Sequence, residues 1–278
     1  MIRDCWLAAP ITNHESQIAN HESVIVYHSR LSLSDLFSRR RKDEPDAADG
    51  GDAPAHPTKA LAKFLASLTL NARPQSLLLD LGPVVGTNVT FFGEELGCKI
   101  LVENLFKDID RHTEEGKLEE LPAFFEKRFV QPEGSVDGIL CWDIFDYMDR
   151  PASQALARHL VRILRPDGAL LAQFSTVEPP ASQAPTYTKY VVVDRQTLQY
   201  RPYPAARGKQ RPLLNRDIQR MFEPLRITEQ FLLKNSLREV LFRKPASPQP
   251  RSGEGGPPVP QPRSAEGGAA APVGSPKH

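Results

Sequence analysis

Short, continuous apolar runs alternate along the chain with segments of helical periodicity. The apolar runs predict strands at residues 76–82, 99–103, 123–130, 136–142 and 169–175. Apolar residues recur every three or four positions, which predicts helices, at residues 59–70, 87–97, 104–121 and 151–164. An uninterrupted apolar run is typical of a strand buried on both faces. Strands that alternate with helices predict an α/β fold with a mostly parallel, doubly wound sheet and helices on both faces.

The end of this region has a different order of elements. Residues 215–222 predict a short helix, and residues 226–234 and 237–244 predict two strands with only Asn235 and Ser236 between them. A connection this short requires antiparallel pairing, because a parallel crossover needs a dozen or more residues. The predicted sheet is therefore parallel with an antiparallel edge strand.

Composition separates this region from its flanks. Residues 245–278 contain nine Pro and six Gly, and a segment this poor in apolar side chains cannot offset the entropy lost on ordering. Residues 1–58 hold a basic run beside an acidic, Gly- and Pro-rich run, which favours a poorly ordered extension and linker. The predicted folded domain is therefore 59–244, followed by a disordered tail at 245–278.

Charge and cysteine content exclude several classes of protein. The chain has 35 Lys+Arg against 34 Asp+Glu, a balance that disfavours a general nucleic-acid binder. Cys5, Cys98 and Cys141 lie far apart, so neither a disulfide framework nor a structural metal site is expected. No apolar run approaches the ~20 residues that span a bilayer. The opening apolar stretch is also short for a signal peptide. We expect no membrane partner and a cytoplasmic location.

Candidate ligand-binding residues follow the first two predicted strands. Gly82 and Gly86 lie in the first strand–helix turn, where backbone can approach a ligand closely and the helix N-terminus favours an anionic group. Asp80 precedes the turn, and Glu103 ends the second strand, 21 residues after Gly82. A carboxylate there can accept two hydrogen bonds from a ribose diol. Together these residues predict a nucleoside-type ligand, although each alone is also compatible with a tight turn or a helix cap.

A dinucleotide is the weaker alternative for this ligand. Val84 holds the middle position of the turn, so the G-x-G-x-x-G pattern of dinucleotide-binding loops is absent. Asp80 directly before the loop suits a ligand that carries an ammonium group better than one that carries a pyrophosphate. An NAD-dependent oxidoreductase is therefore the less favoured enzyme class.

These residues, together with 134–137 and the 162–168 turn, resemble the class I S-adenosylmethionine-dependent methyltransferases, including those of type 11. The resemblance implies a Rossmann-like, seven-stranded sheet and S-adenosyl-L-methionine as the cofactor. It implies that Asp80, Gly82 and Gly86 hold the methionine part of the cofactor and that Glu103 holds the ribose. Trp142, at the end of the fourth strand, would line the cofactor near its methyl group.

Two features depart from the family pattern. Val84 replaces the usual middle glycine, and residues 127–131 offer no acid for the adenine. These departures leave open a methyltransferase fold that binds the cofactor poorly or not at all. The candidates for a general base are Asp143 and Asp146, in the stretch after the fourth strand. Capping of the next helix is the alternative role of Asp146.

Residues 176–214 form an unusually long connection for this position. Four tyrosines and a local basic excess in 185–220 accompany a predicted β-hairpin. Long insertions are often lids or substrate loops, so the segment is interpreted either as a lid over the site or as a basic surface hairpin. The methyl acceptor is unidentified; an anionic or aromatic small molecule, or RNA, would suit this composition.

Three functions follow from the sequence. The first is an enzyme that transfers a methyl group to an unidentified acceptor by in-line displacement, which mainly requires alignment of nucleophile and methyl. The second is a catalytically silent methyltransferase fold used as a binding module. The third is the NAD-dependent oxidoreductase.

Overall fold

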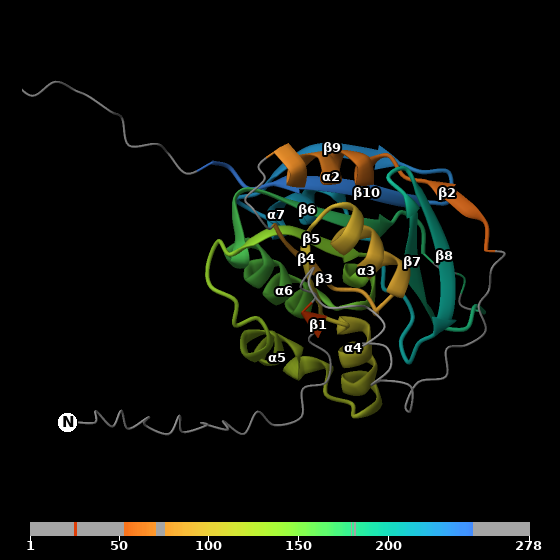
Figure 1. Cartoon of the computed structure of the whole chain (residues 1–278). Helices are drawn as coiled ribbons and strands as arrows, with labels where there is room; N and C mark the ends of the chain where they lie inside the picture. Colours follow the sequence, from red (N-terminus) through yellow and green to blue (C-terminus); the bar gives the residue numbers. More distant parts are fainter. Residues whose placement is uncertain (1–24, 27–52, 71–75, 179, 181, 247–278) are drawn as a thin grey trace, which may run out of the picture. The chain divides into compact units, whose positions relative to one another are not determined.

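The computed structural model describes residues 25–26, 53–70, 76–178, 180 and 182–246 (Figure 1). The predictions for 247–278, and for 1–58 apart from 25–26 and 53–58, fall outside these residues. One compact unit extends to Ala246.

A mixed, mostly parallel sheet forms the centre of this unit. Its spatial order is β4 (Lys99–Val102), β3 (Leu77–Asp80), β5 (Val136–Trp142), β6 (Leu164–Ser175), β10 (Leu237–Arg243) and β9 (Arg226–Leu232). The first four strands are parallel, and β10 is antiparallel to both of its neighbours. The antiparallel strand, β10, is therefore second from the edge. The edge strand, β9, runs in the same direction as β6. At the other end, the two residues of β1 (Ile25–Val26) pair antiparallel with β4.

Helices cover both faces of the sheet. One face carries α2 (Ala60–Leu70) and α3 (Gly86–Thr90), which continues as a π-helix over Phe91–Glu95. The other face carries α4 (Leu105–Glu114), α5 (Leu121–Arg128), α6 (Arg150–Ile163) and α7 (Asn215–Met221). Two short 3-10 helices lie at Leu118–Glu120 and Ile144–Tyr147. Figure 1 shows α2 across β9 and β10, and α3 beside β7. The result is a three-layer α/β/α arrangement.

Local sequence explains why α6 begins and ends where it does. The side chain of Asp149 accepts a hydrogen bond from the Ala152 backbone N–H at 3.0 Å, and Pro151 lies in the first turn, where its missing N–H costs nothing. Leu156, Leu160 and Ile163 share the buried face. Asp167 then adopts a left-handed conformation, with φ 61°, as the chain enters β6.

The strand predicted at 123–130 is wrong, because these residues belong to α5 and the turn that follows it. Leu121, Phe125 and Phe129 recur every four residues, and all three are buried against the sheet. Pro122 lies in the first turn of the helix, a position that favours helix initiation. The short apolar run was therefore one face of a helix, an ambiguity that periodicity leaves open in short segments.

A second, smaller sheet covers the face that holds α3. It contains β7 (Thr186–Asp194), β8 (Thr197–Pro204) and β2 (Ala55–Pro57), in the order β2-β8-β7, with antiparallel pairing throughout. The hairpin β7–β8 packs into the core through Tyr190, Val192 and Leu198. It is thus an integral layer of the domain over the carboxyl ends of the central strands.

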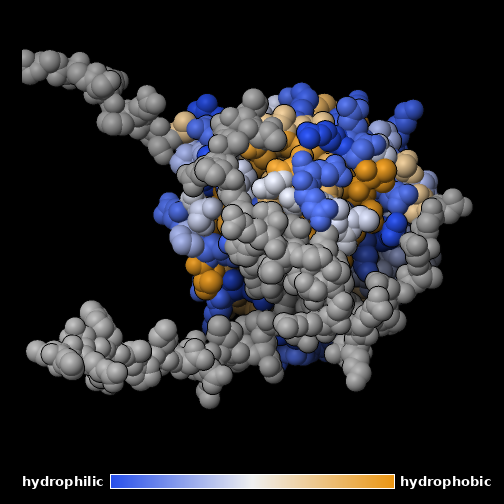
Figure 2. Space-filling model, viewed as in Figure 1, coloured by the Kyte–Doolittle hydropathy of each residue, from blue (hydrophilic) through white to orange (hydrophobic). Residues whose placement is uncertain are grey.

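The described surface is mixed in polarity. In Figure 2, hydrophilic residues border small hydrophobic areas on the part of this face that grey atoms leave visible. Within the described ranges, no helix has the length and apolar character needed to cross a membrane. The same ranges contain no group of three His, Cys, Asp or Glu side chains suited to a metal ion.

Candidate functional site

Asp80 lies at the end of β3, where the sequence placed a ligand-binding carboxylate. Its side chain is buried, and Oδ1 accepts hydrogen bonds from the Gly82 backbone N–H at 2.9 Å and from the Trp142 indole N–H at 2.7 Å. Burial raises the pKa of Asp80 to about 6, although both hydrogen bonds oppose the rise. Residues of the chain itself therefore satisfy the oxygen that faces the glycine turn.

Trp142 fills the space above that turn. It ends β5 with φ 49°, a left-handed conformation that is rare for a bulky residue. A Cβ atom added at Gly82 would lie 2.8 Å from Trp142 Cδ1, so the indole lies directly on the glycine backbone. The indole also stacks on the Tyr190 ring, with centroids 5.0 Å apart and planes 3° apart. The space where the resemblance would place the methionine part of the cofactor is thus occupied by an aromatic pair.

Asn88 fastens the hairpin over this pair. Its side-chain N–H donates to the Tyr190 carbonyl at 2.8 Å, and its Oδ1 accepts from the Val192 backbone N–H at 2.7 Å. Asn88 is buried within α3, two residues after Gly86, which begins that helix. The glycine turn, the helix after it and the hairpin are therefore connected by buried polar contacts as well as by packing.

Replacing Asn88 with Ala is expected to loosen the hairpin. The change leaves a buried carbonyl and a buried N–H without partners, and each such loss costs about 1–3 kcal/mol. Hydrogen exchange should increase most in 186–204 and little in β3 to β6. The isosteric variant Asn88→Asp keeps the acceptor for Val192 but places a buried carboxylate against the Tyr190 carbonyl, so its exchange should also increase. Equal exchange in all three proteins would contradict this role of Asn88.

Glu103 directly follows β4 and lies beside Asp80, since its backbone N–H donates to the Asp80 carbonyl at 2.7 Å. Its carboxylate is buried and forms an ion pair with Arg128 at 2.5 Å. Burial raises the pKa of Glu103 to about 7, and Arg128 opposes this rise. The carboxylate proposed to hold a ribose is therefore paired with a guanidinium from the end of α5. Sequence reasoning missed Arg128 because it placed a strand there.

Asp143 and Asp146 lie together after β5, and both are buried. Lys209 Nζ lies 2.7 Å from Asp143 Oδ2 and 3.1 Å from Asp146 Oδ2. Asp146 also accepts hydrogen bonds from the Ser175 backbone N–H at 2.9 Å and from the Ser175 hydroxyl at 2.6 Å. Burial raises the pKa of Asp146, as does Asp143, while Lys209 opposes the rise. The basic excess in 185–220 was the one sequence signal for Lys209.

A cavity of about 640 Å³ lies on the outer side of this network. Its lining includes Tyr190 and Tyr200 from the hairpin, Ser175 from the end of β6, and Lys209, whose ammonium group donates to the Ser175 hydroxyl. This cavity adjoins the candidate carboxylates Asp143 and Asp146 but is not lined by Asp80, Gly82 or Glu103. The structure therefore divides the predicted site into a filled crevice and an adjoining cavity.

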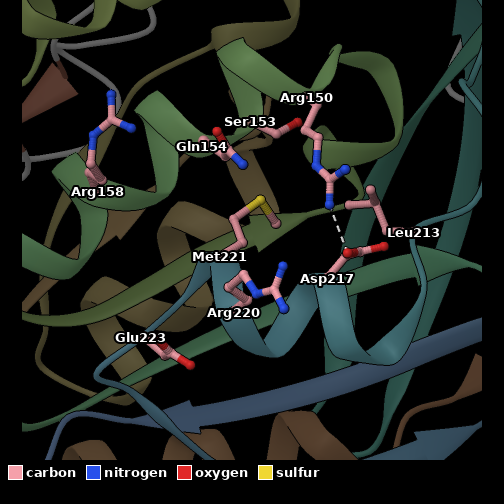
Figure 3. Close-up of a pocket in the computed structure, with 9 residues that line it drawn as sticks. All are labelled: Arg150, Ser153, Gln154, Arg158, Leu213, Asp217, Arg220, Met221 and Glu223. Atoms are coloured by element: carbon pink, nitrogen blue, oxygen red, sulfur yellow. Dashed lines mark hydrogen bonds and ion pairs between the residues drawn. The ribbon is translucent and has the colours of Figure 1, made fainter.

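A second cavity, of about 330 Å³, lies between α6 and α7 (Figure 3). The Arg150 guanidinium and the Asp217 carboxylate face each other at 2.7 Å, and Met221 extends toward Gln154. Arg158 points away from the other side chains drawn. Its charged groups are surface residues of both signs, and Ser153 is the buried polar residue among those that line it, so its chemistry favours no particular ligand.

Comparisons with known proteins give distant likenesses only. No family model matches the chain, and no curated protein matches it significantly. Solved structures that resemble it include the 1,6-didemethyltoxoflavin-N1-methyltransferase of Burkholderia thailandensis (14% identity, 67% of this chain and 77% of that chain, TM-score 0.39) and the [4+2]-cyclase SpnF (12%, 68% and 81%, 0.41). A third is the glycopeptide N-methyltransferase MtfA in complex with S-adenosylmethionine (14%, 68% and 95%, 0.34). Likeness at this level does not decide function.

Proposed function

We propose that this chain is a binding module with a methyltransferase-type fold, whose cofactor crevice is filled by its own side chains. The observation that carries this proposal is the position of Trp142. Its indole donates to Asp80, covers Gly82 and stacks on Tyr190. An open cofactor site needs free space over the glycine turn, because the ligand must approach the backbone there closely.

The other predicted contacts support the same proposal. Arg128 pairs with Glu103, so a ribose would have to compete with a buried guanidinium for the carboxylate. Breaking a buried ion pair costs about 3–5 kcal/mol. Two ribose hydrogen bonds to the carboxylate, at about 1.5–3 kcal/mol each, would do little more than offset that cost. The residues present therefore do not fit an open S-adenosylmethionine site.

Calorimetric titration with S-adenosylhomocysteine tests the proposal. We expect no binding to the parent chain, and measurable binding to the double variant Trp142→Gly/Arg128→Gln. Glycine at 142 removes the indole and tolerates the left-handed backbone. The matched variant Trp142→Phe keeps an aromatic ring and is expected to stay closed. Circular dichroism would establish that each variant folds.

S-adenosylmethionine-dependent methyl transfer to an unidentified acceptor is the second candidate function. It is favoured by Asp80, Gly82 and Glu103, which lie together at the carboxyl ends of β3 and β4. Tight binding of S-adenosylhomocysteine by the parent, weakened roughly tenfold or more by Glu103→Ala as expected for a charged hydrogen bond, would favour this function over a filled crevice. NAD belongs in the same titrations, because binding of NAD alone would instead indicate the oxidoreductase.

A further inference from the structure

The cavity beside Lys209 has aromatic walls. Tyr190 and Tyr200 approach edge to face, with ring centroids 5.2 Å apart, and His56 of β2 stacks on Tyr200 at 4.5 Å. All three residues line the cavity. Rings in such an arrangement provide flat apolar surfaces, and their electron-rich faces attract organic cations.

Carboxylates outnumber cations around this cavity. Glu178 lines the cavity, and Asp143 and Asp146 lie behind Lys209, the lysine among the lining residues. Glu239, on β10, is a further buried carboxylate, held by the Thr58 hydroxyl and by the backbone N–H groups at the start of α2. These four carboxylates stand against Lys209 and against Arg238, which interacts with Asp146. The balance favours a cationic ligand, in contrast to the anionic acceptor that the basic composition of 185–220 suggested.

A buried amide, that of Gln173, lies near this cavity. It is fully buried on β6, opposite Glu239 in the register of β10, and neither amide atom has a hydrogen-bond partner among the described residues. Side chains alternate along a strand, so Gln173 lies on the same face of β6 as Ser175. Ser175 lines the cavity, whereas Gln173 and Asp143 are fully buried behind its lining. Asp143 Oδ1 also lacks a hydrogen-bond partner in the described part of the chain. Buried polar atoms are rarely left unpaired, so this pair points to a polar ligand group.

We propose that this cavity binds a small organic amine. Its ammonium group would reach past Lys209 to Asp143 Oδ1 and the Gln173 carbonyl oxygen, and its aromatic or apolar body would lie against Tyr190 and Tyr200. Lys209 Nζ faces Oδ2 of both Asp143 and Asp146, so one ammonium group stands against two carboxylates, and Asp143 Oδ1 has no hydrogen-bond partner among the described residues. The inference rests on the proposed binding module and names its ligand class.

Tyramine is the probe, with two controls of the same ring. 4-Ethylphenol lacks the ammonium group, and 3-(4-hydroxyphenyl)propionate carries a carboxylate in its place. Calorimetric titration of the full chain is expected to show that tyramine binds at least tenfold more tightly than either control. Equal binding of tyramine and 4-ethylphenol would overturn the amine assignment, as would preference for the propionate or no binding of any probe.

Gln173→Leu supplies the matched variant. Because the Gln173 amide has no hydrogen-bond partner within the described ranges, its replacement by an apolar side chain of similar size is expected to leave the melting temperature unchanged or higher. Tyramine affinity should fall at least tenfold, while Gln219→Leu, on the exposed side of α7, should have no effect. Unchanged affinity in Gln173→Leu would overturn the proposed contact.

The titrations also separate this inference from the proposed function. If S-adenosylhomocysteine and tyramine both bind the parent, and Gln173→Leu weakens only tyramine, the filled crevice fails and the amine site stands. If neither binds the parent, and Trp142→Gly/Arg128→Gln binds S-adenosylhomocysteine, the amine site fails and the filled crevice stands.

Discussion

Replacing Arg128 with Met is expected to lower the free energy of unfolding by about 3–5 kcal/mol, since it leaves a buried carboxylate without its partner. Arg128 and Glu103 are both buried, and the guanidinium connects the end of α5 to the end of β4. Methionine preserves most of the apolar stem of the arginine, so the loss would come mainly from the charge. Urea denaturation at neutral pH measures it.

The control for this prediction is the double variant Glu103→Gln/Arg128→Met, which removes both charges. It is expected to recover most of the lost stability, because a neutral amide is far cheaper to bury than an unpaired carboxylate. Arg158→Met, on the exposed surface of α6, should change stability by no more than ~0.5 kcal/mol. A loss below ~1 kcal/mol in Arg128→Met, the size of a surface ion pair, would show that Glu103 does not depend on this pair.

The second large effect is expected in the dependence of stability on pH. Burial raises the pKa of Asp80 from 3.8 to about 6, so in that interval the folded state holds a proton that the unfolded state has released. Stability therefore falls as the pH rises through the interval, and the full penalty is present above it. A rise of about two pKa units corresponds to roughly 3 kcal/mol. Glu103 acts in the same direction, up to about pH 7.

Asp80→Asn isolates this contribution. The amide keeps an oxygen that can accept from the Gly82 and Trp142 N–H groups, and it does not ionise. The variant is expected to match the parent near pH 4 and to exceed its stability by up to about 3 kcal/mol near pH 8. Denaturation curves at several pH values measure the difference. A variant less stable than the parent at pH 8 would show that the ionised carboxylate is the favoured form.

Sequence patterns predicted the strands that are buried on both faces. β3, β4 and β5 read as continuous apolar runs because helices or the hairpin cover both sides of the sheet. The strand prediction for 123–130 was wrong because a short amphipathic helix and a short strand can share the same apolar residues. Its correct assignment depends on packing against the sheet, which local sequence does not contain.

The candidate site shows a similar division. Asp80, Gly82 and Glu103 lie together at the carboxyl ends of β3 and β4, as their positions in the sequence predicted. Their partners Trp142 and Arg128 were beyond sequence reasoning for different reasons. Trp142 was placed near the site, but the conformation that turns its indole onto the glycine depends on its φ of 49°. Arg128 reaches Glu103 only because α5 is a helix.

The buried indole also has an optical consequence. Trp142 is one of two tryptophans in the chain, the other being Trp6. In a Trp6→Phe background, the ultraviolet emission of the protein would therefore arise from Trp142 alone. A side chain with 2% of its surface exposed should emit at short wavelength, and departure of the indole from Gly82 into water would shift that emission to the red. The crevice thus carries its own fluorophore, and its opening can be followed in real time without a label.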